Sequence, residues 1–330
     1  MRRVPKIGKV LLLLIIGIMI GATPATAIDY PKQGSTVTFV VPYSPGGNSD
    51  TNTRILAAGL ERLFPGVSFV VLNKPGAGTQ TGMLYVLKSK PDGYTLAHIS
   101  SGGFFSSYLR PDRKAIYSLK DFVPIASHQI GKSGAFVRSD SDFKTLKDLI
   151  TYAKDHPKEL KAGCASVLGS THLGTLGLQR GTGAEFSLVH FGSGSKQRTA
   201  LLGGHVDLVV TGIDGMMSLL ESGDFRLLAV LSDERSKFFP DVSTAIELGY
   251  DVQTKPMQGT AAPAGTPQEI INILSDAIGK VLGMPKFAAM FGAVGAEIYY
   301  RPAEEYTQIL TEEEKRMKTA LEFAIKDASK

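Results

Sequence analysis

The sequence has little of several features that would define its class at once. Its 330 residues include one cysteine, no tryptophan and only 20% charged residues, whereas 43% are hydrophobic. This composition excludes an intrinsically disordered chain, and a single cysteine excludes a scaffold held by internal disulfides. A chain of this length can bury one large core or two medium ones.

Positive charge is also scarce once its location is considered. The formal net charge is +5, but Arg2, Arg3, Lys6 and Lys9 supply four of these charges, which leaves +1 for the rest of the chain. No Lys/Arg-rich run occurs further on. Because polyphosphates are bound through dense positive charge, we expect no nucleic-acid partner.

Residues 1–27 have the three parts of a secretory signal peptide. The basic stretch is followed by an apolar core from Val10 to Ile20 and by the small residues Ala25-Thr26-Ala27. An apolar helix of that length spans about 16 Å, roughly half of a membrane's hydrocarbon core, so cleavage after Ala27 is favoured over a permanent anchor. Since no later run is long enough to span a membrane, we expect a soluble, exported, periplasmic protein.

Motifs for catalysis and for metal binding are missing. The sequence has no Gly-x-Ser-x-Gly elbow, and its six histidines lack metal-ligand spacing. Cys164 has no locally paired histidine, so we interpret it as a small structural residue. We therefore expect no metal, no cofactor and no enzymatic activity, although a convergent triad or a hydrolase that uses His172 or Cys164 stays open.

Apolar runs alternate with helical segments along most of the chain. The N-terminal part predicts a strand at Thr36–Pro42, a helix from Asn48 to about Leu63, and a β-α-β-α-β order up to Ile99. The pattern repeats between Gly134 and Leu231, and the closing segment is mainly helical. This alternation predicts an α/β fold of mostly parallel sheets flanked by helices, with two domains fitting better than one. Binding sites in such folds lie at the carboxyl ends of strands.

The loop after the first strand, Pro42–Asp50, is the most informative segment. Gly46 and Gly47 allow a tight turn with exposed N–H groups, and the following helix adds its unpaired amides and the positive end of its dipole. These groups could hold a carboxylate or a phosphate. The alternative is an ordinary strand-to-helix turn in which Asn48, Ser49 or Asp50 caps the helix.

A second loop, Cys164–Leu173, has the same strand-to-helix character. Ser170 and Thr171 could receive the other end of an anionic ligand, or one of them could simply be the N-cap of the next helix. His172 is more typical of a packed or capping residue than of a catalytic one.

Several ordered signatures make the chain resemble a known family from about Tyr30 to the last helix. The signatures are Val40-Val41-Pro42-Tyr43-Ser44-Pro45-Gly46-Gly47-Asn48-Ser49-Asp50, Asn73-Lys74-Pro75-Gly76-Ala77-Gly78, Lys90-Pro91-Asp92-Gly93-Tyr94-Thr95-Leu96, Leu119-Lys120-Asp121-Phe122-Val123-Pro124-Ile125-Ala126, Leu201-Leu202-Gly203-Gly204-His205-Val206-Asp207-Leu208, Phe239-Pro240-Asp241-Val242 and Ala262-Pro263-Ala264-Gly265-Thr266-Pro267. With these motifs the chain resembles the extracytoplasmic solute receptors of tripartite tricarboxylate transporters, the Bug family.

The resemblance implies a two-lobed periplasmic binding protein of the type II-like flytrap kind. Each lobe would be a mixed, mostly parallel sheet flanked by helices. The implied limits are 28–126 with 255–330 for lobe one and 127–254 for lobe two. Such receptors bind a small organic acid between the lobes and deliver it to membrane permease subunits, or, as the alternative, report it to a sensor kinase ectodomain.

The resemblance also assigns the candidate binding residues. In the family, backbone N–H groups and ordered waters hold the ligand carboxylate. The corresponding positions are Tyr43, Ser44, Gly46, Gly47, Asn48, Ser100 and Ser101 in lobe one, and Ser166, Gly169, Ser170, Thr171, His172 and Asp214 in lobe two.

The chain departs from the family pattern mainly in lobe two. Ser166 and Leu168 stand where the family usually has glycines, and Leu168 adopts positive φ less readily than glycine. Phe191-Gly192-Ser193 replaces the usual Tyr-Lys-Gly, and Lys255-Pro256-Met257 lacks the usual aromatic residue. Because a phenolic hydroxyl and a cation are lost, we expect a ligand that is less charged or differently shaped than a di- or tricarboxylate.

Overall fold

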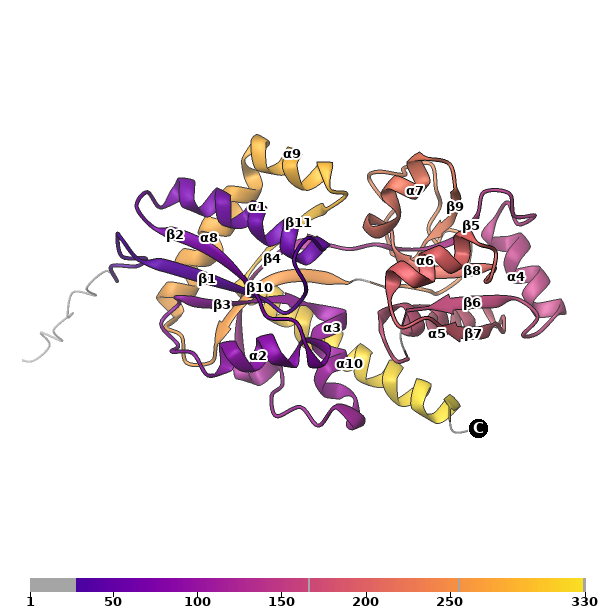
Figure 1. Cartoon of the computed structure of the whole chain (residues 1–330), viewed down its shortest axis with the longest axis horizontal. Coiled ribbons are helices and arrows are strands. Elements are labelled where there is room, and N and C mark those ends of the chain that lie inside the picture. Colours follow the sequence, from indigo (N-terminus) through magenta and orange to yellow (C-terminus); the bar gives the residue numbers. More distant parts are fainter. Residues whose placement is uncertain (1–27, 166, 255, 329–330) are drawn as a thin grey trace, which may run out of the picture.

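The computed structural model describes residues 28–165, 167–254 and 256–328, which form two α/β lobes placed side by side (Figure 1). The predicted signal peptide, Ser166 and Lys255 lie outside the described residues. No helix in the described ranges is both long and apolar enough to cross a membrane. The elements of lobe one are β1 (Thr36–Val41), α1 (Asn48–Leu63), β2 (Ser68–Asn73), η1 (Ala77–Thr79), α2 (Gln80–Leu87), β3 (Thr95–Ser100), α3 (Ser101–Leu109), η2 (Pro111–Arg113), η3 (Leu119–Asp121), β4 (Phe122–Ile130), β10 (Met257–Pro263), α8 (Gln268–Gly283), α9 (Pro285–Ala293), β11 (Glu297–Pro302) and α10 (Ala303–Ala328). Those of lobe two are β5 (Ser133–Arg138), α4 (Leu146–Asp155), β6 (Lys161–Cys164), α5 (Ser170–Thr182), β7 (Ser187–His190), α6 (Gly194–Leu202), β8 (Leu208–Gly212), η4 (Asp214–Met216), α7 (Met217–Glu221) and β9 (Phe225–Val230).

The six-stranded sheet of lobe one has the order β11-β4-β10-β3-β1-β2. Strand β1 pairs in parallel with β2 and β3, whereas β10 pairs antiparallel with β3 and β4, and β11 pairs antiparallel with β4. The five-stranded sheet of lobe two, β7-β6-β8-β5-β9, is parallel at β7-β6-β8 and antiparallel at β5. The prediction of mixed sheets is confirmed, but the expectation that they are mostly parallel is wrong. The antiparallel pairs involve strands that cross between the lobes or return after a crossing.

Each sheet is covered by helices on both faces because side chains alternate along its strands. In lobe one, Phe39 packs with α1, α8 and α9, whereas its neighbour Val40 packs with α2, α3 and α10. In lobe two, Val137 packs with α4 and α5, and Phe136 packs with α6 and η4. Each lobe is therefore a three-layer sandwich, which confirms the two-lobed α/β fold.

The chain passes between the sheets after β4 and before β10. Strand β4 stays in the sheet of lobe one up to Ile130, beyond the limit predicted at residue 126, and β10 begins at Met257. Next to the first crossing, Lys132, which directly precedes β5, pairs with Glu297 of β11 at 3.0 Å, and both side chains are buried. Glu297 Oε1 also accepts hydrogen bonds from Ser236 Oγ (2.9 Å) and from the Lys237 N–H (3.1 Å). These contacts connect the two lobes beside the β4–β5 crossing.

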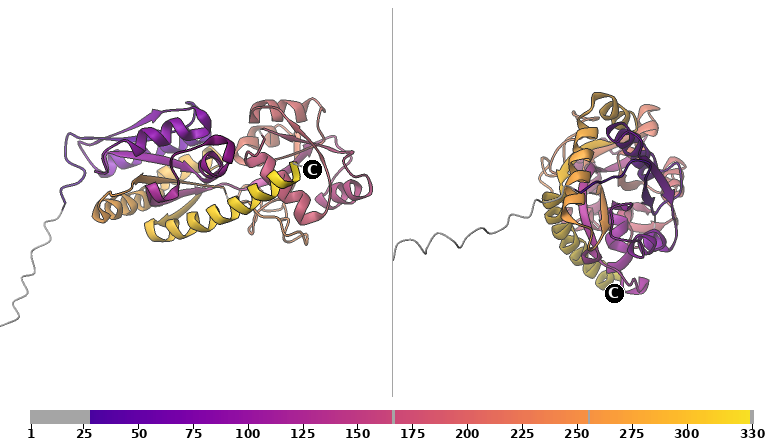
Figure 2. Two further views of the ribbon diagram at one scale, coloured as in Figure 1. Left: turned by 90° about the horizontal axis from the view of Figure 1, so that it is seen from below. Right: turned by 90° about the vertical axis from the view of Figure 1, so that its left-hand side faces the viewer.

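Helix α10 is a third link between the lobes. It packs on α3 and β4 of lobe one and on α5 of lobe two. Figure 2 shows this C-terminal helix running beneath both lobes. Its first half is anchored by the fully buried Tyr306 and Leu310, whereas its second half lies next to α5.

Candidate functional site

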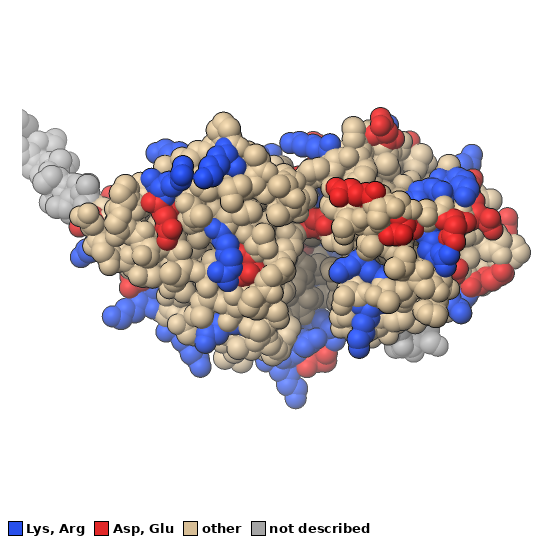
Figure 3. All heavy atoms as spheres, turned by 45° about the horizontal axis from the view of Figure 1, so that its top comes forward, with Lys and Arg blue, Asp and Glu red and all other residues tan. Residues whose placement is uncertain are grey.

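The candidate site lies between the lobes, where the loops that follow β1, β3, β6 and β8 meet. The side-chain amide of Asn48 donates a hydrogen bond from Nδ2 to the Asp214 carboxylate across this gap. Arg110 Nη1 donates to the Val167 carbonyl at 2.9 Å. A Cβ placed at Gly102 would lie 3.5 Å from Ser170 Cβ. Figure 3 shows a hollow between the lobes, with acidic and basic side chains intermixed on both sides of it.

The loop between β1 and α1 owes its shape to a buried carboxylate. Asp50 is 3% exposed, and it accepts hydrogen bonds from the Gly46 N–H (2.8 Å), Asn73 Nδ2 (2.9 Å) and Arg54 Nε (3.1 Å). Burial alone would raise the pKa of this carboxyl, but the bonds from Arg54, Gly46 and Asn73 outweigh burial and lower it. Asn73 also donates to the Tyr43 carbonyl (3.0 Å). Asp50 was expected only as a possible cap, and it is the anchor of the loop.

Three helices begin at the site without a side-chain cap. The N-cap residues of α1, α3 and α5 are Gly47, Ser100 and Gly169, and none of them makes a side-chain capping bond. In lobe two, α4 begins instead with a complete capping box of Thr145 and Asp148, and Ser193 caps α6. Helices α8 and α9 of lobe one also begin without a side-chain cap. The first-turn N–H groups of α1, α3 and α5 are therefore left for another acceptor.

The lobe one residues predicted for the site do come together. Ser44, Gly46 and Gly47 are exposed, and the Tyr43 hydroxyl lies over Gly103 in the first turn of α3. Burial raises the pKa of Tyr43 to about 12, against the effect of a hydrogen bond with Ser100, so this phenol is a neutral donor. Ser101 is buried, and its Oγ accepts from the Met257 N–H at 3.0 Å.

In lobe two the predicted roles of several residues need correction. Neither Ser170 nor Thr171 is the N-cap of α5, because both lie inside its first turn after Gly169. Thr171 Oγ1 accepts from the Ala165 N–H (2.8 Å) and so holds the loop. His172 is 6% exposed, as expected for a packed residue, and its Nδ1 accepts from the Leu168 N–H (2.9 Å).

Leu168 adopts a positive φ, the backbone conformation that a leucine side chain disfavours. Its φ is 54°, in the left-handed region where a side chain costs about 1–2 kcal/mol. The hydrogen bond to His172 holds its amide in that conformation. The His172 ring also packs edge-on against His190, with ring centroids 4.7 Å apart.

Asp214 and Asn48 join a polar chain that enters lobe one. Asn52 Nδ2 donates to Asn48 Oδ1 (2.7 Å) and to the side chain of Gln129 on β4. Burial raises the pKa of Asp214, against hydrogen bonds from its own and the Gly215 N–H and the field of Arg198. Asp214 and Asn48 thus contact each other across the gap.

Sequence reasoning missed two arginines at this site. Arg110, at the end of α3, reaches the lobe two loop through the Val167 carbonyl. Arg198 of α6 places its Nη1 within 3.7 Å of a Cβ built on Gly215, next to Asp214. Both lie far in sequence from the loops they approach. No short-range motif could therefore indicate either residue.

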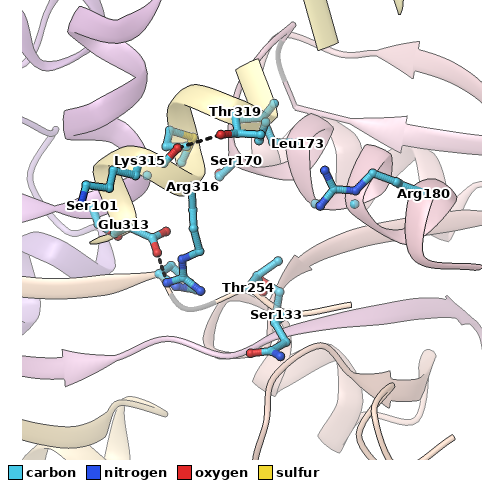
Figure 4. A pocket seen from close by; sticks show the side chains of 17 residues that line it. Ser101, Ser133, Ser170, Leu173, Arg180, Thr254, Glu313, Lys315, Arg316 and Thr319 are labelled. Carbon is cyan, nitrogen blue, oxygen red and sulfur yellow. Dashed lines mark hydrogen bonds and ion pairs between the residues drawn. The ribbon is translucent and has the colours of Figure 1, made fainter. Parts of the chain in front are cut away.

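A cavity of about 400 Å³ extends from the site along α5 and α10 (Figure 4). Ser101, Gly102 and Ser170, from the first turns of α3 and α5, line one end of it. Its other lining residues are Ser133, Leu173, Gly174, Gly177, Arg180, Gln253, Thr254, Pro256, Glu313, Lys315, Arg316, Met317, Thr319 and Ala320. The volume falls in the range of small-molecule sites.

Cys164 has the properties of a structural residue. Its thiol is buried, and burial raises its pKa to about 11, against a hydrogen bond with Thr175. The thiol is therefore protonated near neutral pH. This state does not favour a nucleophilic role.

Residues 53–324 match the family described as the tripartite tricarboxylate transporter family receptor, TctC. The chain belongs to this family. BugT of Bordetella pertussis is 32% identical to this receptor, and the matched region covers 86% of this receptor's chain and 88% of BugT.

Solved structures of the same kind superpose on this receptor over most of its length. MatC from Rhodopseudomonas palustris with bound malate covers 87% of this chain and 98% of its own, at 27% identity and a TM-score of 0.73. A second R. palustris protein, with adipate, covers 90% and 98%, at 28% identity and a TM-score of 0.78.

Proposed function

We propose that this receptor binds a small carboxylate-containing organic acid between its lobes in the periplasm and delivers it to the permease subunits of a tripartite tricarboxylate-type transporter. One observation carries the proposal: α1, α3 and α5 begin at the interlobe gap without side-chain caps. Unpaired N–H groups at helix N-termini attract anions through hydrogen bonds and through the helix dipole.

The proposed roles follow from how each residue is held. Backbone N–H groups of Gly47 and Asn48 face the ligand from lobe one, and those of Gly169, Ser170 and Thr171 face it from lobe two. The Gly46 N–H is taken by Asp50, so Gly46 contributes through the turn that its positive φ allows. Hydroxyls of Tyr43, Ser44, Ser100 and Ser101 supplement them. Ser166, outside the described residues, keeps its proposed binding role, and His172 and Asp214 contribute by fixing the lobe two loop and the contact with Asn48.

The ligand class is supported by the relatives. MatC holds malate and the second R. palustris protein holds adipate, and both ligands are dicarboxylates. A carboxylate that accepts several N–H bonds gains about 1.5–3 kcal/mol from each, so recognition does not depend on a dedicated arginine or lysine.

Calorimetric titration of the purified protein with a panel of organic acids tests the binding step. A bound acid at 100 times its Kd should add about 2.7 kcal/mol to the free energy of unfolding. If no carboxylate binds or raises the melting temperature, the proposed function fails.

Two glycine substitutions, one in the β1–α1 loop and a control in a loop of lobe two, test whether the acid binds at the lobe one loop. Gly46 and Gly249 have φ of +79° and +85°, and a Cβ on either would meet nothing within 4 Å. Gly46→Val and Gly249→Val should therefore cost similar stability through backbone strain, whereas only Gly46→Val should weaken acid binding, by about tenfold or more. Equal affinities of the two variants would contradict the proposed site.

Delivery to the membrane needs a separate measurement. Cells that lack this receptor should no longer take up the acid that it binds, and the wild-type gene should restore uptake. Unchanged uptake together with loss of a transcriptional response to the acid would favour the sensor alternative instead.

A further inference from the structure

The cavity next to the site is formed by one face of each of two helices that belong to different lobes. On α5, Ser170, Leu173, Gly174, Gly177 and Arg180 recur at the three- and four-residue spacing of a single helix face. On α10, Glu313, Arg316, Met317 and Ala320 line the cavity with the same spacing, and Lys315 and Thr319 line it as well. A molecule in this cavity would contact both lobes.

The middle of the cavity suits an apolar chain. Leu173, Met317 and Ala320 line it with carbon, and the glycines of α5 leave it wide. A Cβ at Gly177 would meet no heavy atom within 4 Å, so the helix surface here borders open space. A Cβ at Gly174 would lie 2.9 Å from Val210, which shows that α5 sits close to β8 at that point.

The two ends of the cavity suit anions. At the inner end lie the uncapped first turns of α3 and α5, with Ser101 and Ser170. Near the outer end, the guanidinium of Arg180 points into the cavity (Figure 4), and within the described ranges it makes no hydrogen bond or ion pair. Arg316 differs, because its guanidinium pairs with Glu313.

The separation of the two ends can be read from helix geometry. Ten residues separate Ser170 from Arg180, which corresponds to about 15 Å along an α-helix. Helical side chains tilt toward the N-terminus, so the Arg180 guanidinium lies closer to Ser170 than this backbone separation. A longer diacid therefore fills more of this cavity than a short one such as succinate or malate.

We propose that the cavity between α5 and α10 is a chain-length subsite, and that the ligand of this receptor is an α,ω-dicarboxylate with an apolar body. One carboxylate binds at the N-termini of α3 and α5, the body lies along Gly177 and Met317, and the distal carboxylate binds Arg180. This assignment rests on the proposed function and adds the length and the second charge of the acid to it.

A dicarboxylate series tests the subsite by calorimetry on the mature protein, with succinate, adipate and suberate as probes and octanoate as the probe without a distal charge. Affinity should rise from succinate to suberate, by about fourfold for each methylene that enters the apolar cavity. Octanoate should bind more weakly than suberate, because it cannot pair with Arg180.

Two variants with matched controls locate the effect. Arg180→Gln should lower suberate affinity about tenfold and leave succinate and octanoate unchanged, whereas Arg62→Gln, in the last turn of α1, should change none of them. Gly177→Leu should fill the cavity and reduce suberate affinity to the level of succinate. Gly283→Leu, at the last residue of α8 and equally free of neighbours within 4 Å, is its control.

Succinate binding separates the possible failures. If succinate binds to the wild type and to Gly177→Leu alike, and suberate binds no better than succinate to either, the subsite is overturned while the proposed function stands. The subsite is also overturned if suberate binds more tightly than succinate but neither Arg180→Gln nor Gly177→Leu changes its affinity. If no acid in the series or in the wider panel binds to the wild type, the proposed function fails and the subsite fails with it.

Discussion

The two loops that face each other across the site have the same strand-to-helix plan but are held in different ways. In lobe one, the positive φ of the β1–α1 loop falls on Gly46, and the buried carboxylate of Asp50 holds the Gly46 amide. In lobe two, the positive φ falls on Leu168, and the neutral ring of His172 holds the Leu168 amide. The lobe one loop is thus free of left-handed strain and is held by a charged carboxylate, whereas the lobe two loop is strained at Leu168 and is held by a neutral imidazole.

This difference indicates how rigid each half of the site is. A carboxylate with three donors keeps its bonds as long as it stays ionised, and hydrogen bonds to charged groups are the stronger kind. An imidazole nitrogen can accept only while it is unprotonated. We therefore expect lobe one to present a fixed set of N–H groups and lobe two to present a more adjustable one.

The largest effect is expected for Asp50→Ala. The change leaves the Gly46 N–H, Asn73 and Arg54 without their shared acceptor, so the free energy of unfolding should fall by about 3 kcal/mol and acid affinity should fall at least tenfold. Urea unfolding and calorimetry measure the two quantities.

Asp148→Ala is the matched control for this carboxylate. Asp148 completes the capping box of α4, far from the site, so its loss should cost about 1 kcal/mol and leave affinity unchanged. If Asp50→Ala behaved like Asp148→Ala, the loop of lobe one would not depend on its charged anchor.

An effect of intermediate size is expected from pH. Burial lowers the pKa of His172 from 6.5 to about 4, with a smaller contribution from His190, so the unfolded chain takes up this proton first as the pH falls. Stability contributed by the neutral ring is therefore lost between pH 6.5 and 4, by about 2 kcal/mol at pH 4.5. For Asp50 the ionised form is the one that stabilises the fold, because its pKa is lowered in the folded protein. The stability that this carboxylate contributes is therefore lost only as the pH falls below 3.8.

Hydrogen exchange can follow the two loops separately. From pH 7 to 4.5, protection factors should fall for the Leu168 amide and stay constant for the Gly46 amide. The His172→Asn variant, whose side-chain oxygen does not titrate, should remove the pH dependence at Leu168. Parallel losses in both loops would instead indicate a global response, to which the buried His98 and His128 of lobe one would contribute because burial lowers both of their pKa values.

Sequence reasoning predicted the strand-loop-helix units of both lobes because their apolar runs are bounded by glycine loops. It missed β4, β10 and β11 as strands and α3 as a helix. Strand β10 consists largely of small residues with no alternating pattern, and α3 begins with Ser101-Gly102-Gly103, which are poor helix formers. Tertiary packing determines these elements, since α3 buries Phe104 and Phe105 among α2, α10 and the sheet.

The same limit applies to the site. The glycine and serine loops were predictable, because strand ends followed by helix starts indicate anion sites within a few residues of sequence. The anchors Asp50 and His172 were recognised as residues of these loops, but the groups that they hold could not be assigned. Arg180, Arg198 and the α10 face were missed because only the folded chain brings residues so far apart in sequence together.

The smallest effect is expected for Leu168→Gly, which tests whether the strain of the lobe two loop matters. Glycine removes about 1–2 kcal/mol of left-handed strain but adds backbone entropy to the unfolded chain, so the net stabilisation should be about 0.5 kcal/mol. Lys158→Gly is the matched control, because Lys158 also has a positive φ, 63°, in an exposed loop of lobe two. Both changes should raise the melting temperature slightly, and only Leu168→Gly should alter acid affinity, because only Leu168 precedes the first turn of α5. Unaltered affinity in Leu168→Gly would show that the strained conformation is incidental to binding and that the two loops differ in stability alone.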